Sequence, residues 1–422
     1  MPRSEIPARA TRARLRKLLY AGLCTAAATV LVGAAVKADD QGNHEEQFTL
    51  LTTMQVPPTT DNTCTSGLGV NGIKAFDISF VDPTLDNYFL ADRTNCSVDV
   101  YSTDSNTFLY RVGGFVGASP GGFDLSGPDG VLTVSHSQVW AGDGDSTVKI
   151  IDLASKSIVA TVSTGGTKRA DEMALDPRDG IVVVANDADA PPFLSFISTT
   201  APYNVLGTLP FANATNGLEQ PAWSPRTGLF YLSVPELNHV VGQGEIAVID
   251  PNTRAIVKTF PVSCEPAGLA LGPENEAFVG CSDGPVQVIN IRSGAHIRSF
   301  PQVGFADEVW FNPGDGHFFS ASGSNVVNGT PTPVLGVIDA QTKQFDENVP
   351  TAVGDHSVAA DQLRNHVFLP SQATSSNPQC SNGCIEVFAC QARHGGHGDT
   401  ADNGHGHGHG HGNDCQSHGE GD

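Results

Sequence analysis

The sequence predicts an all-β fold, a seven-bladed β-propeller of four-stranded antiparallel blades. A short alternating strand recurs seven times, and a polar turn and a further strand follow each copy. The copies end at residues 102, 152, 198, 250, 290, 339 and 389. No amphipathic helical period of useful length follows the first forty residues. Copies at a near-constant period indicate a repeat architecture in which each unit packs on its neighbours.

Each repeat carries signals for four strands. The alternating strand is clearest at 148–152, 246–250, 286–290 and 335–339. A turn such as Asp250–Thr253 follows, and then a strand such as Ala255–Val262. Two further strands around a Gly-containing turn precede it, as in residues 173–185. Pro, Asp and Asn favour such turns because they fix φ or bond the nearby backbone, so each repeat is expected to form one antiparallel sheet.

Radial packing of seven such sheets explains how each sheet buries both of its faces. The seventh repeat lacks an outer strand, because His-rich sequence follows Cys390. The segment Phe48–Val56 resembles the missing strand, although it lies at the other end of the chain. We therefore expect it to pair with Ile385–Ala389, so that the propeller spans residues 47–392 and the N-terminal strand closes the last blade.

The repeat has a consensus order: a Gly-containing turn, an apolar strand, a V-x-V-I-D strand, a Thr-containing turn and a final strand. This order resembles the YVTN-type propeller repeat over about residues 47–392. The resemblance implies the seven-bladed fold. It does not imply a function, because one scaffold hosts many chemistries.

Residues 1–38 are predicted to be an export signal. Basic residues up to Lys17 precede the apolar run Leu18–Val36, and the small residues around Ala38 suit cleavage. The alternative is an uncleaved membrane anchor, because an apolar run of this length could just span a bilayer. Cleavage would leave an exported protein, periplasmic or extracellular, that has no membrane contact.

Eight cysteines follow this signal, and an even number in an exported chain favours disulfides. The sequence leaves their pairing open. Repeat position favours a bridge between Cys64 and Cys96, and it favours a second one between Cys264 and Cys281. The cysteines of segment 380–384 lack the spacing of a redox or zinc motif, so they are interpreted as structural.

The formal net charge of the chain is −22, and cleavage of the signal would make it more negative. An acidic surface repels phosphate backbones and anionic lipid. The charge therefore argues against nucleic-acid and membrane-surface binding. It is compatible with cationic or neutral ligands and with metal ions.

A candidate site lies at the mouth of the central channel. In YVTN-type propellers the start of each innermost strand faces this channel, and ligands usually bind there. Aligning the repeats places acids and one histidine at that mouth: Asp77, Asp171, Glu172, Glu219, Asp307, Glu308 and His356. Such carboxylates repel one another unless a cation or a basic ligand lies among them.

A small molecule or a protein is therefore the expected ligand, and a divalent cation is a candidate occupant. Oxygen ligands suit Ca²⁺, Mg²⁺ or Mn²⁺, and an added imidazole from His356 extends the choice to Zn²⁺ or Fe. His356 could also act as a general base near neutral pH. The alternative interpretation is that these polar side chains only hold water and neighbouring loops.

Two segments also resemble the metal-dependent gluconolactonase and regucalcin propellers. Glu219–Trp223 is similar to their Glu-Gly-Pro-x-Trp strand, with Gln220 in place of glycine. Residues 171–176 are similar to their Asp-Gly-Met-x-x-Asp strand, with Glu172 in place of glycine. The resemblance implies Glu219 and Asp171 as metal ligands. Both replacements put a bulky side chain where that family has none.

The C-terminal tail, residues 393–422, is predicted to be disordered, because it lacks the apolar residues that would offset chain ordering. It contains His394, His397, His405, His407, His409, His411 and His418. Alternating Gly and His from Gly404 to Gly412 can chelate Ni²⁺, Zn²⁺ or Cu²⁺ in shifting sets. The alternative is a solubilising tail that binds metal incidentally.

The sequence thus predicts an exported binding propeller with a ligand or partner at the acidic channel mouth and a metal-chelating tail. A metal-dependent, lactonase-like hydrolase acting at the same mouth is one alternative. A scaffold subunit of a periplasmic oxidoreductase is another, because related propellers serve in that role. Nucleophile-elbow, phosphate-loop and CxxCH haem motifs are absent from the sequence.

Overall fold

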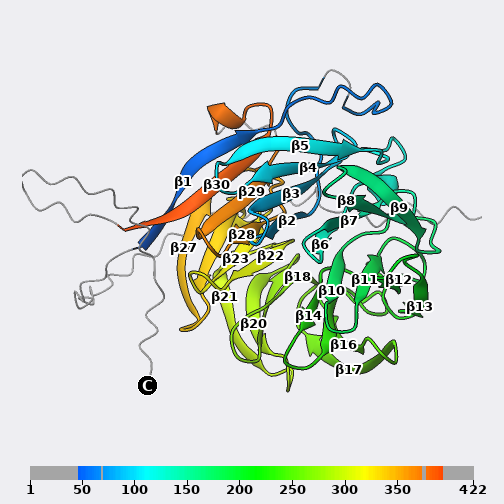
Figure 1. Ribbon diagram of the computed structural model, residues 1–422. Coiled ribbons are helices and arrows are strands. Elements are labelled where there is room, and N and C mark those ends of the chain that lie inside the picture. The colour runs from blue at the N-terminus through cyan, green and yellow to red at the C-terminus, as the bar shows by residue number, and fades with distance from the viewer. Residues whose placement is uncertain (1–45, 68–69, 373–376, 393–422) are drawn as a thin grey trace, which may run out of the picture. The chain divides into compact units, whose positions relative to one another are not determined.

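Seven four-stranded antiparallel sheets are arranged in a ring, so the predicted seven-bladed β-propeller is confirmed (Figure 1). The computed structural model describes residues 46–67, 70–372 and 377–392. The predicted export signal and the His-rich tail lie outside the described residues. Among the described residues, no helix is long and apolar enough to cross a bilayer.

Blades 1 to 6 are each built from strands in chain order, from the innermost strand outward. Blade 1 has β2 (Ser79–Asp82), β3 (Asn87–Asp92), β4 (Ser97–Ser102) and β5 (Thr107–Gly113). Blade 2 has β6 (Val131–Val134), β7 (Gln138–Asp143), β8 (Thr147–Asp152) and β9 (Ser157–Ser163). Blade 3 has β10 (Met173–Asp176), β11 (Ile181–Asn186), β12 (Phe193–Ser198) and β13 (Val205–Pro210).

The next three blades repeat this order. Blade 4 has β14 (Pro221–Ser224), β15 (Leu229–Val234), β16 (Gly244–Asp250) and β17 (Ala255–Val262). Blade 5 has β18 (Pro266–Leu271), β19 (Glu276–Cys281), β20 (Pro285–Asn290) and β21 (His296–Gly304). Blade 6 has β22 (Val309–Asn312), β23 (His317–Ser322), β26 (Val334–Asp339) and β27 (Gln344–Pro350). A hairpin of β24 (Val326–Val327) and β25 (Thr330–Pro331) extends from blade 6, and two 3₁₀ turns lie at η1 (Phe123–Leu125) and η2 (Pro378–Cys380).

Blade 7 joins the two ends of the described chain. Its strands are β28 (Ala359–Asp361), β29 (His366–Ser371), β30 (Cys384–Ala392) and, on the outside, β1 (Glu46–Gln55). β1 pairs antiparallel with β30, with Met54 opposite Ile385. Phe48 is buried and packs edge-on against Phe319 of blade 6 at a ring distance of 5.2 Å. The outer strand thus also contacts the neighbouring blade.

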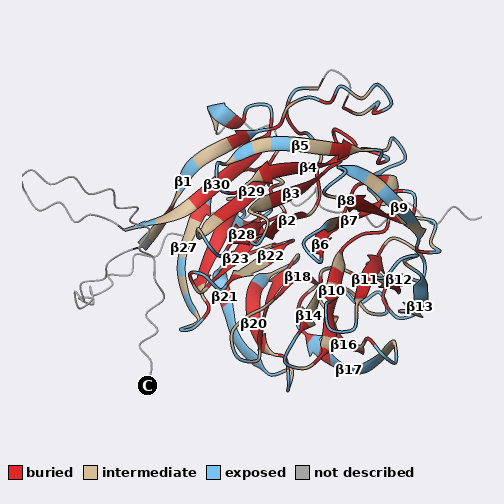
Figure 2. Ribbon diagram, viewed as in Figure 1, coloured by how far each residue is buried: buried red, intermediate tan, exposed pale blue. Residues whose placement is uncertain are grey.

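Burial follows the radial position of each strand (Figure 2). Every residue of β11 is buried, because the faces of blade 3 are covered by blades 2 and 4. The outer strand β9 instead alternates between exposed and half-buried residues. A two-residue period with one solvated face is the pattern of a half-covered strand. The core is therefore a set of apolar layers between blades.

Three disulfides lie in the described part of the chain: Cys64–Cys96, Cys264–Cys281 and Cys380–Cys384. The first two confirm the pairs favoured by repeat position. The third confirms a structural role for segment 380–384, where it closes the turn that leads into β30.

Candidate functional site

The predicted acids gather at one mouth of the ring because the innermost strands run in the same direction through it. Strand register aligns the residues that precede these strands. Equivalent positions hold Asp77, Asp129, Asp171, Glu219, Ala267, Asp307 and His356 in blades 1 to 7. The predicted set therefore occupies one ring of positions. Sequence alignment missed Asp129, although it precedes β6 by the same two positions as Asp77 precedes β2.

Two arginines inside the protein neutralise one side of this mouth. Arg93 Nη2 lies 2.7 Å from Asp77 Oδ2, and the same guanidinium forms an ion pair with Asp129. Arg169 Nη2 lies 2.6 Å from Asp171 Oδ2. Arg169 also binds Asp187 through two hydrogen bonds, of 3.1 and 2.9 Å. On this side of the mouth the chain itself supplies counter-charges to the aspartates.

Neither arginine was recognised from the sequence. Arg93 follows the second strand of blade 1, and Arg169 lies in the loop before β10. Their positions have no equivalent in the repeat consensus. The aligned aspartates were the signal that could have pointed to these arginines. Aspartates buried at a common mouth must have cationic partners nearby.

His356 is held as a cation. Its ring stacks on Phe76 at 4.4 Å, and its Nδ1 donates a 2.7 Å hydrogen bond to the Gly354 carbonyl. Nε2 lies 3.7 Å from Asp77 Oδ1. Burial lowers the pKa of His356, but the bond to Asp77 and the charge of Asp307 outweigh burial and raise it to about 9. A protonated imidazole neither accepts a proton nor binds a metal, so this geometry disfavours both predicted roles.

Three glutamates at the mouth, from blades 3, 4 and 6, have no such partner. Within the described residues, Glu172, Glu219 and Glu308 form no ion pair with arginine, lysine or histidine. Glu172 and Glu308 are buried and raise each other's cost of ionisation, and two carboxyl groups that share a buried site keep a proton. The two residues belong to blades 3 and 6.

The pKa values of these glutamates reflect the shortage of positive charge. Burial, assisted by the charge of Asp307, raises the pKa of Glu308 to about 8. Burial raises the pKa of Glu172 well above its usual range, and the charges of Glu308 and Glu219 add to this. Burial and Asp307 likewise raise the pKa of Glu219. Near neutral pH this half of the mouth is therefore held partly protonated.

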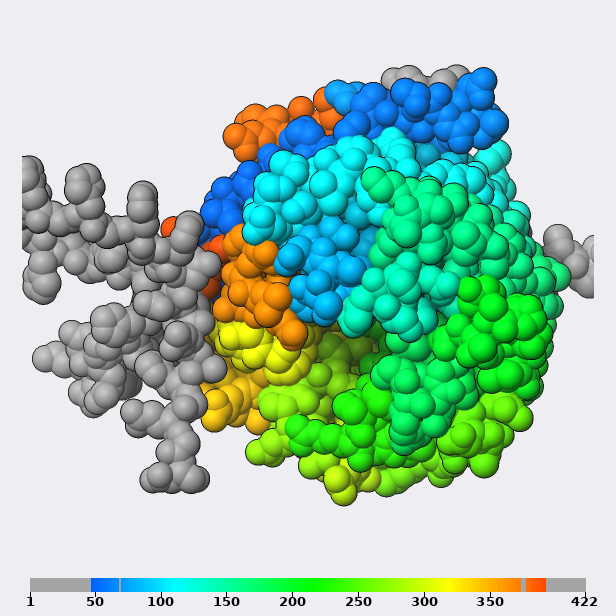
Figure 3. All heavy atoms as spheres, viewed as in Figure 1, coloured from blue at the N-terminus to red at the C-terminus, as the bar shows by residue number. Residues whose placement is uncertain are grey.

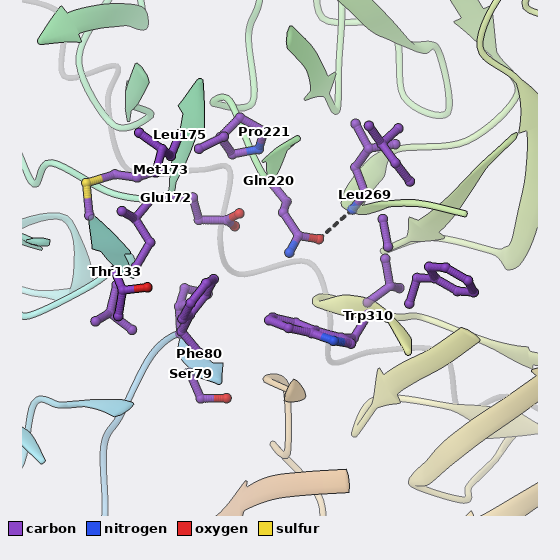
Figure 4. A pocket seen from close by; sticks show the side chains of 18 residues that line it. Ser79, Phe80, Thr133, Glu172, Met173, Leu175, Gln220, Pro221, Leu269 and Trp310 are labelled. Atoms are coloured by element: carbon purple, nitrogen blue, oxygen red, sulfur yellow. Dashed lines mark hydrogen bonds between the residues drawn. The ribbon is translucent and has the colours of Figure 1, made fainter. Parts of the chain in front are cut away.

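A cavity of about 340 Å³ lies in the channel, and Glu172 is the one of these glutamates that lines it. Residues of six innermost strands line it, mostly with apolar side chains. The space-filling view shows a shallow depression where the blades meet (Figure 3). Glu172 and Gln220 point toward the middle of the cavity, and Phe80 and Trp310 lie across from them (Figure 4). Gln220 Oε1 accepts a hydrogen bond from Leu269 N at 2.5 Å.

Phe80 and Trp310 form an aromatic wall, with ring centroids 5.6 Å apart in an edge-to-face arrangement. The two residues belong to blades 1 and 6, on either side of blade 7. Ala359 and Ala360 occupy the innermost strand of blade 7 and are too small to separate them. The alanines therefore allow the two rings to meet across the intervening blade.

A metal site at the mouth can be assessed from its donor atoms. Asp77, Asp129 and Asp171 offer carboxylate oxygens within 4.8 Å of one another, and all three are buried. Arg93 and Arg169 bind these same carboxylates, so positive charge already occupies their surroundings. These residues fit a divalent metal poorly. The same holds for the gluconolactonase-like ligand pair, because Asp171 is committed to Arg169.

Comparisons with known proteins leave the family open. No family model matches the sequence, and no curated protein is significantly similar to it. The YVTN-type and gluconolactonase-type resemblances therefore have no support beyond the propeller fold.

Proposed function

We propose that this chain is a binding protein that takes a small molecule into its channel at the acidic mouth. The observation that carries this proposal is the cavity of about 340 Å³ lined by Glu172, which forms no ion pair among the described residues. Ligand sites are concave and mostly apolar, with a few convergent polar groups and perturbed pKa values. The apolar walls and the polar groups of Glu172 and Gln220 match that description.

Binding is favoured over hydrolysis by the state of the polar groups. The residue that would be the general base, His356, carries a proton at neutral pH. The aspartates that would hold a metal are paired with arginines. The lactonase-like and oxidoreductase-scaffold alternatives stay predictions without a feature that favours them.

We also propose that the protein is exported and that its tail binds a transition metal. Three disulfides in the described chain support an oxidising compartment, where such bonds persist. The metal-binding proposal rests on the histidines of the tail, which lies outside the described residues. We also propose that the chain belongs to the YVTN-type family. The repeat consensus and the seven blades support this proposal.

Tryptophan fluorescence tests the channel proposal, because Trp310 is the one of the three tryptophans that lines the cavity. Full-length protein, kept in EDTA so that the tail is metal-free, would be screened with small cations, sugars and lactones. We expect a channel ligand to change the emission spectrum and to raise the Tm. The Trp310→Phe variant should keep the rise in Tm and lose the spectral change. A spectral change that survives in Trp310→Phe, or a panel without any binder, would contradict the proposal.

A further inference from the structure

The charges at the mouth divide into a satisfied half and an unsatisfied half. Arg93 and Arg169 serve the aspartates of blades 1 to 3. The carboxyl groups of Glu172 and Glu308 have only each other, and they are 5 % and 3 % exposed. Burying a carboxylate without a partner is costly, so the pair keeps a proton. A bound cation from solvent could replace this proton and compensate the negative charge of the two glutamates.

The chemistry of the walls specifies which cation would fit. Ca²⁺ and Mg²⁺ need six or more oxygen ligands around them, and Zn²⁺ needs about four N, S or O ligands. This cavity instead presents apolar side chains from six strands, including Met173, Leu175 and Leu271. The rings of Phe80 and Trp310 face the side that bears Glu172 and Gln220 (Figure 4). Carboxylates and aromatic faces together attract organic cations, whose charge is spread over a partly apolar surface.

We propose that the cavity binds a small organic ammonium ion, with its charged head at Glu172, which lines the cavity and interacts with Glu308 behind it, and its apolar body against Trp310 and Phe80. This inference rests on the proposed function and names the ligand class of the same site. The ammonium N–H groups donate charge-assisted hydrogen bonds to the Glu172 carboxylate, and the neighbouring Glu308 adds negative charge behind it. The proton that the pair shares leaves to solvent as the ligand enters, so the charge at the mouth stays constant.

This exchange makes binding depend on pH through a defined set of groups. Glu308 faces Glu172, Asp307, Asp77 and His356. Glu172 faces Glu308, Glu219 and Asp171. Binding of a cation should strengthen from pH 6 to pH 8, because a smaller fraction of the pair then needs to release its proton. A neutral ligand of the same shape should show no such trend.

Three phenyl compounds separate charge from shape: phenethylammonium, 2-phenylethanol and phenylacetate. Full-length protein in EDTA would be titrated with each at pH 7, following Trp310 emission and heat. We expect phenethylammonium to bind at least tenfold more tightly than 2-phenylethanol, and phenylacetate not to bind. Calorimetry in buffers of different ionisation enthalpy should detect close to one proton released per ammonium bound. Glu308→Gln should weaken ammonium binding at least tenfold and leave binding of 2-phenylethanol unchanged.

Glu274→Gln is the matched control, because it makes the same charge change at an exposed turn between β18 and β19. It should leave all three affinities unchanged. Equal binding of phenethylammonium and 2-phenylethanol, both insensitive to Glu308→Gln, would overturn the ammonium inference and leave the channel as a binding site. No Trp310 response to any of the three would overturn the inference and count against the channel as well.

Discussion

Arg93 is almost fully buried, and its guanidinium group bridges Asp77 and Asp129. Replacing it with methionine keeps much of the side-chain volume but leaves two buried carboxyl groups without their cation. We expect Arg93→Met to lower the free energy of unfolding by about 3–5 kcal/mol at pH 7, because removing one partner of a buried pair leaves an uncompensated charge. Urea denaturation measures this.

Arg178→Met is the matched control. Arg178 also lies close to an aspartate, with 2.7 Å between Nη2 and Asp179 Oδ2, but it lies at the surface. Solvent screens such a pair. We expect no measurable change in stability, so equal losses in the two variants would contradict the buried-charge argument.

Glu308 makes a second prediction at the residue scale. Its pKa is about 8 in the folded protein and near 4.5 when unfolded, so the folded state binds more protons between these values. The contribution of Glu308 to stability is therefore fully present below about pH 4.5 and is lost as pH rises to about 8. His356, whose pKa is raised to about 9, contributes stability below about pH 6.5 that is lost through pH 9.

Urea titrations at pH 5, 7 and 9 would measure this dependence. Wild-type protein should lose stability at each step, and Glu308→Gln should lose less between pH 5 and pH 8 because it has no carboxyl group to ionise. Glu274→Gln should follow the wild-type profile. A Glu308→Gln profile parallel to that of wild type would mean that Glu308 ionises normally in the folded chain.

The strands show how far the sequence predicts this molecule. The alternating strand, which ends in Asp, Asn or Ser in six of the seven repeats, marks the third strand of each blade, so blade number and strand order follow from local pattern. The acids before the innermost strands follow from the same alignment. Arg93 and Arg169 do not, because the other repeats have no arginine at the equivalent loop positions. Gly130 and Gly268 are glycines for a steric reason. A Cβ at either position would collide with the backbone of the next blade, at Asp171 and Asp307 respectively.

β1 offers a test at the scale of one element. Phe48 is buried against Phe319 and His317 of blade 6, whereas Leu50 of the same strand is exposed. Phe48→Ala should cost about 3–5 kcal/mol of stability, because it removes a buried ring and leaves a cavity. Leu50→Ala should cost well under 1 kcal/mol, which is usual for surface positions. Similar effects in the two variants would mean that β1 contributes little to the closure of blade 7.

At the scale of the whole molecule, the ring gathers residues that lie more than two hundred positions apart. Asp77 and His356 come from the first and last blades and meet at 3.7 Å. Radial packing of the blades therefore produces both the cavity and its charge imbalance. Because neighbouring blades contribute different residues to the mouth, the charge pattern of the mouth can vary from one side of the ring to the other.

The tail should be separable from this ring. Alternating histidines on a chain without apolar residues can bind Ni²⁺ without any packed structure, so metal affinity should depend on the histidines of residues 404–412 alone. Replacing these four histidines with asparagine should remove most Ni²⁺ binding in calorimetry. The Trp310 response to phenethylammonium should be unchanged, because the channel contributes no imidazole that is free to bind metal. Retention of full Ni²⁺ stoichiometry in this variant would place the metal elsewhere in the chain, and a lost Trp310 response would show that tail and channel are coupled.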